Sequence, residues 1–582
     1  MVGCTVTANS GYGAGGIMVW GTGSMSIADS IVAGNTGNTS TPDYNGYLNS
    51  LDYNFIQNTN GATITGVTTH NLYGKTPLLA PLANNGGPTW THALLPGSPA
   101  IDRGSSGGVT TDQRGQPRPF KFPFLIAAAD GSDIGAYELQ ERAQTNWVVN
   151  GSSSNLVFTV NSTNDVEDGV PGIAHCSLRE AINAANANPT TNTTMITFAT
   201  NVPGISTGVT GTITLTNGQL AISKSVSING PGMTNLTVSG NNSNRVFIVD
   251  IVSAAISGLT VANGYVDHDD GGGIWSYGYL TITSCTFSNN RAYYYGSAIY
   301  NKNALNLNNC LVCSNANSQG YGALWNDGGL LMLESSAVIK NPTTGIESGS
   351  RGTVNLANCT ISGNAAGIGC GTFDSIYINS CTIISNSASD IDFKGTNHIR
   401  NSIIGRGPAG SSWVYSDDYN LIQNRTNSYW ILNILGATNH CIFNQDPKLG
   451  PLAYLGGPTP THPLRYDSPA LNAGNGGGLT TDQRGLPRPI GTPAVAGGDG
   501  SDIGAYEADP NLRLTAIAKS GNDILLNFPT VFGRSYEIDG KNNLNGSWTM
   551  VTNNIPGSGG IMQAVEVGGA DQPRRFYRAV QQ

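Results

Sequence analysis

The sequence has few charged residues, no long apolar run and no cluster of basic residues. Charged residues make up 11% of its 582 residues, which is too few for helices with ion pairs along their exposed faces. No run of about 18 apolar residues occurs, so we expect no membrane-spanning helix. The net charge is −9. With no Lys/Arg cluster, nucleic acid is not an expected partner.

The start of the chain lacks a secretory signal. Met1-Val-Gly-Cys4 has neither the basic start nor the apolar stretch that a signal peptide requires. Because the repeat described next is already present in the first residues, we interpret the chain as starting within a repeat. We therefore expect the natural protein to extend upstream, with a signal peptide.

A repeat dominates the chain, which is rich in glycine, with 77 residues. Its clearest copies are LTITSCTFSNN (280–290), LNLNNCLVCSN (305–315), VNLANCTISGN (354–364) and IYINSCTIISN (376–386). Two series keep step at intervals of 22 to 27 residues. The first is Asn263, Asn290, Asn315, Asn341, Asn364 and Asn386, and the second is Ile274, Ile299, Leu324, Ile346, Ile368 and Ile391.

The period predicts one coil of a parallel β-helix. It is too short for a propeller blade, and no helical half typical of leucine-rich repeats accompanies it. Short alternating runs broken by Gly and Asn fit strands that pair with the coils above and below. We expect Asn290, Asn315, Asn341, Asn364 and Asn386 to form one axial column, in which asparagine tolerates the left-handed backbone of a bend.

The segment 158–189 is predicted to cap an open end of the β-helix. Ser177-Leu-Arg-Glu180 is a capping box, in which the serine accepts from the third helical N–H and the glutamate reaches back. Leu178 and Ile182 then lie on one apolar face of a helix predicted over 177–187. A helix across the edge would protect it from aggregation.

The region that ends the β-helix occurs twice. TTDQRGQPRP (110–119) matches TTDQRGLPRP (480–489), and GSDIGAYE occurs at 131–138 and again at 500–507. We therefore divide the chain into the end of a first copy (1–143), a complete second copy (144–507) and a last module (508–582). The last module alternates apolar and polar residues between Gly/Asn turns, which predicts a small antiparallel β-sandwich.

These segments resemble known families of bacterial surface proteins. CSLREAI (176–182) resembles the CSLREA domain, and the DQRG-x-PRP and DIGAYE segments resemble the choice-of-anchor Q tail. Gly271-Gly-Gly-Ile274 and Phe287-Ser-Asn-Asn290 are similar to repeats of chlamydial polymorphic outer membrane proteins. The resemblance implies a secreted or cell-surface bacterial protein. The fold expected is all-β: a right-handed, pectate-lyase-like parallel β-helix with an N-terminal capping helix and a C-terminal β-sandwich.

The nine cysteines suggest a structural role. Cys285, Cys310, Cys359 and Cys381 occupy the same repeat position, which favours a ladder of small thiols in the core. Disulfides between adjacent coils, 285 with 310 and 359 with 381, are the alternative. The spacings do not suggest a zinc site.

Two sets of charged residues are candidate sites. Asp267, Asp269 and Asp270 lie in one loop, which is interpreted mainly as solvated, although its carboxylates could hold Ca²⁺; no other cofactor is expected. The repeated region, called the tail below (86–138 and 456–507), carries carboxylates and arginines in both copies, for which we favour structural ion pairs over glycosidase chemistry. They are Asp112, Arg114, Arg118, Asp133 and Glu138, repeated as Asp482, Arg484, Arg488, Asp502 and Glu507.

Aromatic residues give the functional hypothesis. Trp275, Tyr300 and Trp325 each follow the inward residue of successive coils, so alternation points them outward in one column, and Tyr321 lies nearby. If the column is bare, its rings could stack on sugars of an extracellular polysaccharide. The alternative is that the rings pack on each other or under a loop.

We therefore expect a secreted or cell-surface scaffold without catalytic residues, adhesin-like or polysaccharide-binding. The runner-up is a polysaccharide lyase or glycoside hydrolase on the same fold. An enzyme needs carboxylates and basic residues that converge on adjacent coils, and our alignment of the coils places none in register.

Overall fold

The computed structural model describes most of the chain. The described residues are 1–37, 41–94, 98–120, 130–139, 146–150, 153–167, 175–188, 193–200, 208–407, 410–424, 430–491, 493, 495–572 and 575–582. They form two compact units, residues 1–210 with 224–229, and residues 211–223 with 230–582. Below, the two are called the first and the second unit, and each is described by itself.

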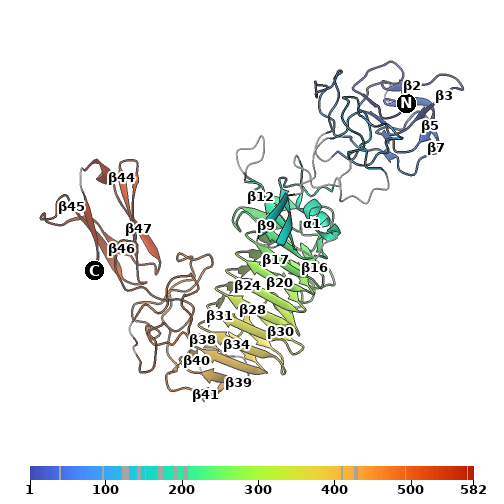
Figure 1. The fold of residues 1–582 in the computed structure, drawn as a ribbon. Coiled ribbons are helices and arrows are strands. Elements are labelled where there is room, and N and C mark those ends of the chain that lie inside the picture. The colour runs from blue at the N-terminus through green and yellow to red at the C-terminus, as the bar shows by residue number, and fades with distance from the viewer. Residues whose placement is uncertain are drawn as a thin grey trace. The chain divides into compact units, whose positions relative to one another are not determined.

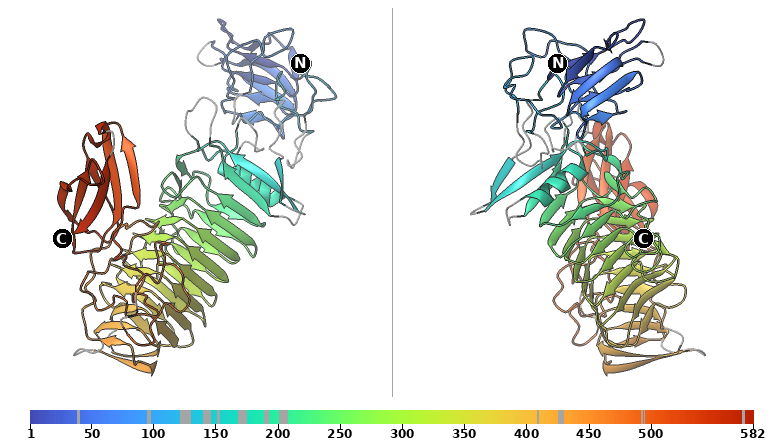
Figure 2. Two further views of the ribbon diagram at one scale, coloured as in Figure 1. Left: turned by 60° about the vertical axis from the view of Figure 1, so that its left-hand side comes forward. Right: turned by 90° about the vertical axis from the view of Figure 1, so that its right-hand side faces the viewer.

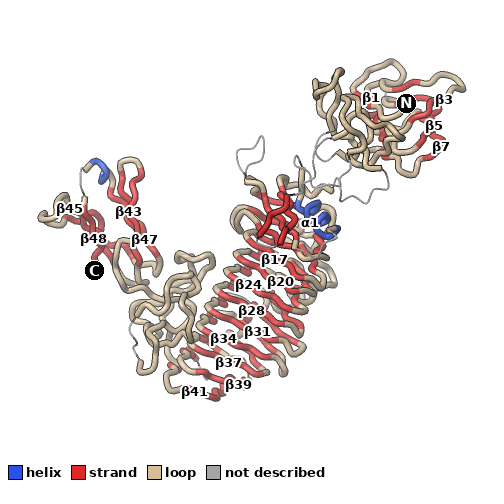
Figure 3. Tube along the Cα trace, viewed as in Figure 1, coloured by secondary structure: helices blue, strands red, loops and turns tan. Residues whose placement is uncertain are grey.

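The second unit contains the right-handed parallel β-helix predicted from the repeat (Figure 1). Most coils contribute one short strand to each of three sheets, and neighbouring strands of a sheet pair in parallel from one coil to the next. Seen from two further sides, the strands lie stacked in flat layers (Figure 2). Among the described residues of this unit, helix is limited to the single turn Gly569–Asp571 (Figure 3).

The strands of the three sheets are as follows, in chain order. Sheet I contains β17 (Ser253–Ser257), β20 (Tyr279–Thr283), β24 (Ala304–Asn308), β28 (Leu330–Glu334), β31 (Thr353–Ala357), β34 (Ser375–Asn379), β37 (Thr396–Arg400), β39 (Gly410–Asp417) and β41 (Trp430–Ala437). Sheet II contains β12 (Gly211–Thr214), β15 (Leu236–Ser239), β18 (Thr260–Ala262), β21 (Thr286–Ser288), β25 (Leu311–Cys313), β29 (Ala337–Ile339), β32 (Thr360–Ser362), β35 (Thr382–Ile384), β38 (Ile403–Arg406), β40 (Leu421–Asn424) and β42 (Ile442–Phe443). Sheet III contains β13 (Leu220–Ile222), β16 (Phe247–Val249), β19 (Ile274–Ser276), β23 (Ile299–Asn301), β27 (Leu324–Asp327), β30 (Thr344–Gly349), β33 (Ala366–Cys370) and β36 (Ile391–Phe393). Two further short strands, β22 (Arg291–Ala292) and β26 (Ala316–Asn317), pair with each other; in the sequence, each follows a strand of sheet II and precedes a strand of sheet III.

The corners on either side of sheet II share one local conformation. A residue with positive φ turns the chain at the corner. The next residue in the sequence is a small polar residue or Cys, and its side chain lies inside the β-helix. Before sheet II the left-handed residues are Ser284, Asn309, Ser335, Asn358 and Ser380; after it they are Asn289, Ser314, Lys340, Gly363 and Ser385. The sequence-based prediction that the stacked asparagines are themselves left-handed is wrong, because each column asparagine directly follows the left-handed residue.

The column asparagines form a continuous hydrogen-bonded ladder. The backbone N–H and the side-chain amide of Asn315 both donate to Asn341 Oδ1, at 2.9 and 3.1 Å. The same pair of bonds joins Asn290 to Asn315, Asn341 to Asn364 and Asn364 to Asn386. All five side chains are buried. The ladder therefore satisfies polar groups that the corner would otherwise leave unpaired.

The two ends of the ladder correct and extend the sequence pattern. Asn263 occupies the left-handed position, and Gly264 takes the ladder position, with its N–H 2.9 Å from Asn290 Oδ1. The interval of 27 residues from Asn263 to Asn290 is one too long for this reason. At the far end, Asp390 accepts both N–H groups of Asn386, at 3.0 and 2.7 Å. A carboxylate suits this place because it is acceptor-only.

The cysteines form part of the core as free thiols. Cys285, Cys310, Cys359 and Cys381 follow the other left-handed row and are buried, as are Cys176 and Cys370. None of the nine cysteines is in a disulfide. Serine fills the same position in other coils, where its hydroxyl accepts a backbone N–H: Ser336 from Cys310 and Ser402 from Cys381, both at 3.0 Å.

This burial predicts the pattern of thiol reactivity. Burial raises the pKa of Cys285 to about 12, and the thiolate is the reactive form. In the native protein we expect a thiol-specific disulfide reagent to modify the partly exposed Cys4, Cys313 and Cys441 at least about tenfold faster than the other six. In denaturant all nine should react alike. Rapid modification of all nine in the native state would contradict a core of stacked thiols.

The first unit contains a capped edge and a shorter set of coils. Helix α1 (Leu178–Ala187) has the predicted capping box: Glu180 N–H donates to Ser177 Oγ at 3.1 Å, and Ser177 N–H donates to Glu180 Oε2 at 2.7 Å. Its buried face, which includes Leu178 and Ile182, packs on β10 (Ser153–Val160) and β11 (Thr194–Phe198). The expectation of an N-terminal capping helix is confirmed. The same sheet continues with β14 (Val226–Asn229) on one side and β9 (Asn146–Asn150) on the other.

The remaining strands of the first unit belong to its own partial β-helix. They are β1 (Thr5–Thr7), β4 (Ile31–Ala33), β6 (Phe55–Ile56) and β8 (Leu72–Tyr73) in one parallel sheet, and β2 (Ile17–Met18), β3 (Ser24–Ile27), β5 (Tyr44–Leu51) and β7 (Ala62–Val67) in the other. Asn9 and Asn35 form a short ladder that ends on Asp43, at 3.0 Å, just as the long one ends on Asp390.

The C-terminal module is confirmed as two antiparallel sheets. One contains β43 (Ala516–Ser520), β44 (Asp523–Pro529) and β47 (Ile561–Glu566), and the other contains β45 (Ser535–Lys541), β46 (Thr549–Pro556) and β48 (Phe576–Gln581). Leu526, Phe528, Tyr536 and Ile538 form its core. The alternation of apolar and polar residues in this module therefore predicted its antiparallel strands correctly.

Candidate functional site

The aromatic column of sheet III is in register but not bare. Trp275, Tyr300 and Trp325 are directly paired neighbours. Tyr300, however, is only 7% exposed, and its hydroxyl donates to Asp327 Oδ2 at 2.6 Å. Its ring meets Trp275 edge-on, with 6.1 Å between centroids. Of the two interpretations left open by the sequence, a bare column and a packed one, the structure favours the packed one.

Neighbouring side chains cover the two tryptophans of this column. Arg245 lies over Trp275, with its guanidinium carbon 4.7 Å from the ring centroid. Tyr295 packs on Trp325 at 4.1 Å, and Tyr321 on the same ring at 5.7 Å. The loops that carry these residues cannot be placed from periodicity, which is why the sequence pattern left the column open. It functions as packing between coils in this structure.

The aspartates of the 267–270 loop are bound by protein groups. Asp269 forms an ion pair with Arg245 at 2.6 Å, and Asp270 Oδ1 accepts the Tyr295 N–H at 3.0 Å. Asp267 lies 2.8 Å from the exposed ring of His268. Within the described ranges no group of three or more His, Cys, Asp or Glu side chains is arranged to hold a metal ion. The loop is held to the coil by Arg245.

A different row of outward side chains forms an exposed aromatic ladder. Tyr377, His398 and Tyr415 are paired neighbours on β34, β37 and β39 of sheet I. The ring centroids of each neighbouring pair lie 5.4 Å apart, and their planes differ by only 12° and 16°. Tyr377 is 45% and Tyr415 43% exposed. Unlike the column on sheet III, this ladder faces solvent.

The ladder borders a hollow of about 400 Å³ on the outward face of sheet I. The three coils before Tyr377 carry Asn355, Met332 and Asn306 in the same row, so the row steps down from rings to smaller side chains. Tyr377 lines the hollow at this step, and Met332 contributes apolar surface to it. Such a step exposes a ring face together with polar groups.

Polar side chains line the flank of the same hollow. The next outward row contains Glu334, Asn379 and Arg400, on β28, β34 and β37. Arg400 is held in place by Asn475, with Nη2 2.7 Å from Asn475 Oδ1. A hollow lined by aromatic rings, apolar surface and amide, carboxylate and guanidinium groups is suited to a sugar, whose ring is apolar on its faces and polar at its edge.

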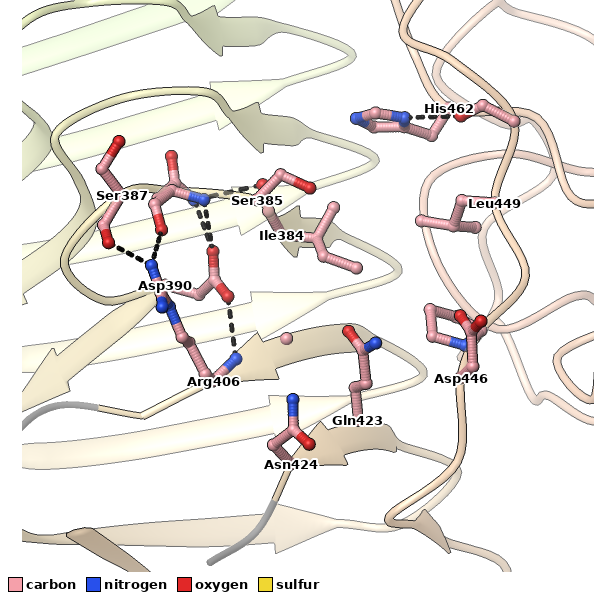
Figure 4. Close-up of a pocket in the computed structure, with 14 residues that line it drawn as sticks. Ile384, Ser385, Ser387, Asp390, Arg406, Gln423, Asn424, Asp446, Leu449 and His462 are labelled. Atoms are coloured by element: carbon pink, nitrogen blue, oxygen red, sulfur yellow. Dashed lines mark hydrogen bonds between the residues drawn. The ribbon is translucent and has the colours of Figure 1, made fainter. Parts of the chain in front are cut away.

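A second hollow, of about 450 Å³, lies where the tail packs beside the coils (Figure 4). Most of its polar groups already have structural partners. Asp390 ends the asparagine ladder, and burial raises its pKa. His462 Nδ1 lies 2.8 Å from the Gly450 carbonyl and Nε2 lies 3.0 Å from Ser362 Oγ, and burial lowers the pKa of its imidazole. Figure 4 shows the coil side chains facing those of the tail. The contact between His462 of the tail and Ser362 of the coils holds the tail against the coils.

The covered column of sheet III continues into two carboxylates. Trp325 pairs with Glu347, Glu347 with Gly369, and Gly369 with Asp392. Burial raises the pKa of Glu347, whose Oε2 accepts the Gly322 N–H at 2.9 Å. The two acids lie two coils apart with Gly369 between them, so they are not the set of carboxylates and basic residues on adjacent coils that the sequence analysis looked for. The signal for this pair was present, because Glu347 and Asp392 directly follow Ile346 and Ile391 of the repeat series.

The tail residues shared by both copies form buried ion pairs. In the second unit Arg484 contacts Asp482 at 2.7 Å and Arg488 contacts Glu507 at 2.9 Å, and all four side chains are almost fully buried. The tail also bonds to the coils: Arg488 Nη1 lies 3.2 Å from Asn358 Oδ1, and Asn401 Nδ2 lies 3.1 Å from the Asp502 carbonyl. In the first unit Arg114 pairs with Asp112 at 2.8 Å, and Arg118 pairs with Asp29.

The tail predicts a fall in stability at alkaline pH. Burial beside Glu507 raises the pKa of Asp502 from 3.8 to about 8. A carboxyl whose folded-state pKa is raised contributes stability that is complete below about pH 4 and is lost as the pH rises through about 8. We expect the unfolding free energy to fall by about 1 kcal/mol or more between pH 6 and pH 9 in urea titrations. The Asp502→Asn variant should show a smaller fall, and an equal slope for both proteins would contradict the assignment.

Comparison with known proteins leaves the family undetermined. No family model matches the chain, and no curated protein matches it. Within the part of the chain described above, no helix is both long and apolar enough to cross a membrane.

Proposed function

We propose that this protein is a secreted or cell-surface scaffold that binds polysaccharide without modifying it. The observation that carries the proposal is the exposed Tyr377–His398–Tyr415 ladder at the edge of a 400 Å³ hollow. The likeness of residues 176–182 to the CSLREA domain and of the tails to choice-of-anchor Q segments supports a bacterial surface location. The site replaces the covered Trp275 column as the candidate glycan surface.

The chemistry of the hollow favours a weak, extended ligand. A sugar ring resting on the face of Tyr377 would gain about 1 kcal/mol from stacking, and the groups around it, such as Asn355 and Asn379, can bond to hydroxyls. Stacking and a few hydrogen bonds of this kind together correspond to a dissociation constant on the order of 1 mM for one site. Many copies on one surface would multiply the avidity, which suits an adhesin.

The ring of Tyr377 should therefore dominate binding. In affinity electrophoresis through gels that contain neutral plant or microbial polysaccharides, we expect at least one polymer to retard the wild-type protein. The Tyr377→Ala variant should lose most of this retardation, with an affinity about fivefold lower, because it removes the ring on which a sugar would stack.

Tyr279→Ala is the matched control, since Tyr279 is 59% exposed on β20 of the same sheet but does not line the hollow. Its mobility should equal that of the wild type in every gel. Equal retardation of the Tyr377→Ala protein, or no retardation of the wild type by any polymer, would contradict the proposal.

A glycoside hydrolase is the second candidate, favoured by Glu347 and Asp392. With one coil between them, their Cα atoms lie roughly 10 Å apart, and Gly369 leaves the space between them without a side chain. Inverting glycosidases separate their acid and base by about 6.5–9.5 Å, and a raised pKa suits the acid. Release of reducing ends by the wild type, abolished in Glu347→Gln, would favour this enzyme over the non-catalytic scaffold.

A further inference from the structure

A third hollow of the second unit, of about 570 Å³, lies along the outside of the asparagine ladder. Its walls come from the residues on either side of each ladder asparagine. Asn289, Ser314 and Lys340 precede the ladder positions, and Arg291 and Ala316 follow them. Asn242 and Pro342 complete the lining. The hollow therefore runs along the axis of the β-helix, with most of its lining on three successive coils and Asn242 on an earlier one.

Its two cations lie at opposite ends of a depression. Arg291 belongs to the first of the three coils and Lys340 to the third, as the successive bonds from Asn290 to Asn315 and on to Asn341 show. Two strand spacings, roughly 10 Å, separate these coils. The middle coil carries only the small side chains of Ser314 and Ala316. A group resting on that coil lies within reach of both cations.

The charge of this hollow differs from that of the whole chain. The chain has a net charge of −9, yet no carboxylate is among the residues that line the hollow. The side chains of Arg291 and Lys340 are exposed and make no ion pair within the described part of the chain. Elsewhere in this unit, cations such as Arg484 and Lys302 have carboxylate partners. Two unpaired cations on either side of a hydroxyl-bearing coil can hold an oxyanion between them.

We propose that this hollow binds the oxyanion groups of an extended acidic polysaccharide, one group lying over Ser314 and Ala316 between Arg291 and Lys340. A polymer fits better than a free anion, because the hollow is far larger than one oxyanion and runs along the axis. The site is separate from the Tyr377 hollow and does not depend on the neutral-polysaccharide function proposed above.

The test is isothermal titration calorimetry of the full chain with alginate, with dextran sulfate and with uncharged dextran, each at several salt concentrations. Alginate carries carboxylates and dextran sulfate carries sulfates, so the two arms distinguish the source of the oxyanion. We expect binding to at least one of them and none to dextran. The Arg291→Gln/Lys340→Gln double variant should bind about tenfold or more weakly, with a reduced dependence of affinity on salt.

Lys519→Gln, which removes an exposed cation of the C-terminal module, should bind like the wild type. Tyr377→Ala should also leave acidic-polymer binding unchanged, which separates this site from the proposed function. Unchanged affinity in the double variant, equal binding of uncharged dextran, or equal affinity for inorganic phosphate and for the polymer would overturn the proposal.

Discussion

Replacing Arg488 by methionine is expected to lower the unfolding free energy by about 3–5 kcal/mol. Its side chain is fully buried and bonds to Glu507, to Asn358 on the coil and to the Tyr506 carbonyl, at 2.9, 3.2 and 2.9 Å. Methionine keeps much of the volume, so the loss comes mainly from leaving buried carboxylates without their cation. Urea unfolding followed by circular dichroism would measure it.

Arg513→Met is the matched control for this prediction. Arg513 also pairs with a carboxylate, Asp509 at 2.8 Å, but its side chain is 55% exposed. Exposed ion pairs contribute about 0–1 kcal/mol, so the control should unfold nearly as the wild type does. Equal losses in the two variants would mean that the tail is not anchored by Arg488.

Replacing Asn341 by alanine is expected to cost about 3–5 kcal/mol, because it interrupts the ladder at its middle. The change removes the acceptor of both Asn315 N–H groups, and it removes the side-chain donors to Asn364 Oδ1 and to the Val312 carbonyl. Each buried group left unpaired costs about 1–3 kcal/mol. The loss should appear as a lower midpoint in denaturant.

The control here is Asn306→Ala, which truncates an asparagine of the outward row on β24. Surface substitutions of this kind usually change stability by less than about 0.5 kcal/mol. If Asn341→Ala were as mild as Asn306→Ala, the asparagine column would not be a source of stability.

The fold followed from the sequence because its determinants are local and periodic. The ladder asparagines and the position of the buried cysteines recur once per coil. The capping box acts between Ser177 and Glu180, which are three residues apart. The exception is Asn263, where one extra residue moves the asparagine to the left-handed corner and leaves Gly264 in the ladder. Counting intervals alone cannot distinguish these two adjacent positions.

The candidate site was less predictable, because exposure depends on loops that have no period. The sequence pattern located the Trp275 column and placed Tyr321 near it, but it did not show that Arg245, Tyr295 and Tyr321 cover the rings. Tyr377, His398 and Tyr415 follow one another at shorter intervals, 21 and 17 residues, than the repeat that defines the column. Only the strand register shows that they share one row.

The two copies of the tail show how one motif tolerates change. Asp29 of the first unit and Asn401 of the second hold equivalent left-handed corners, and each accepts a tail N–H, from Ser105 at 3.0 Å and from Asn475 at 3.1 Å. Arg118 pairs with Asp29, whereas Arg488 bonds to Glu507 and Asn358. The arginine therefore finds a buried acceptor in each copy, which supports a structural role for the motif.

Hydrogen–deuterium exchange with a bound polysaccharide tests the central proposal most directly. The wild-type protein would be exposed to deuterium with and without the neutral polymer that retards it most in gels. The account predicts slower exchange in peptides that cover β34, β37 and β39, which carry Tyr377, His398 and Tyr415, and no change around Trp275. Protection confined to sheet III, or no protection on sheet I at a saturating polymer concentration, would contradict it.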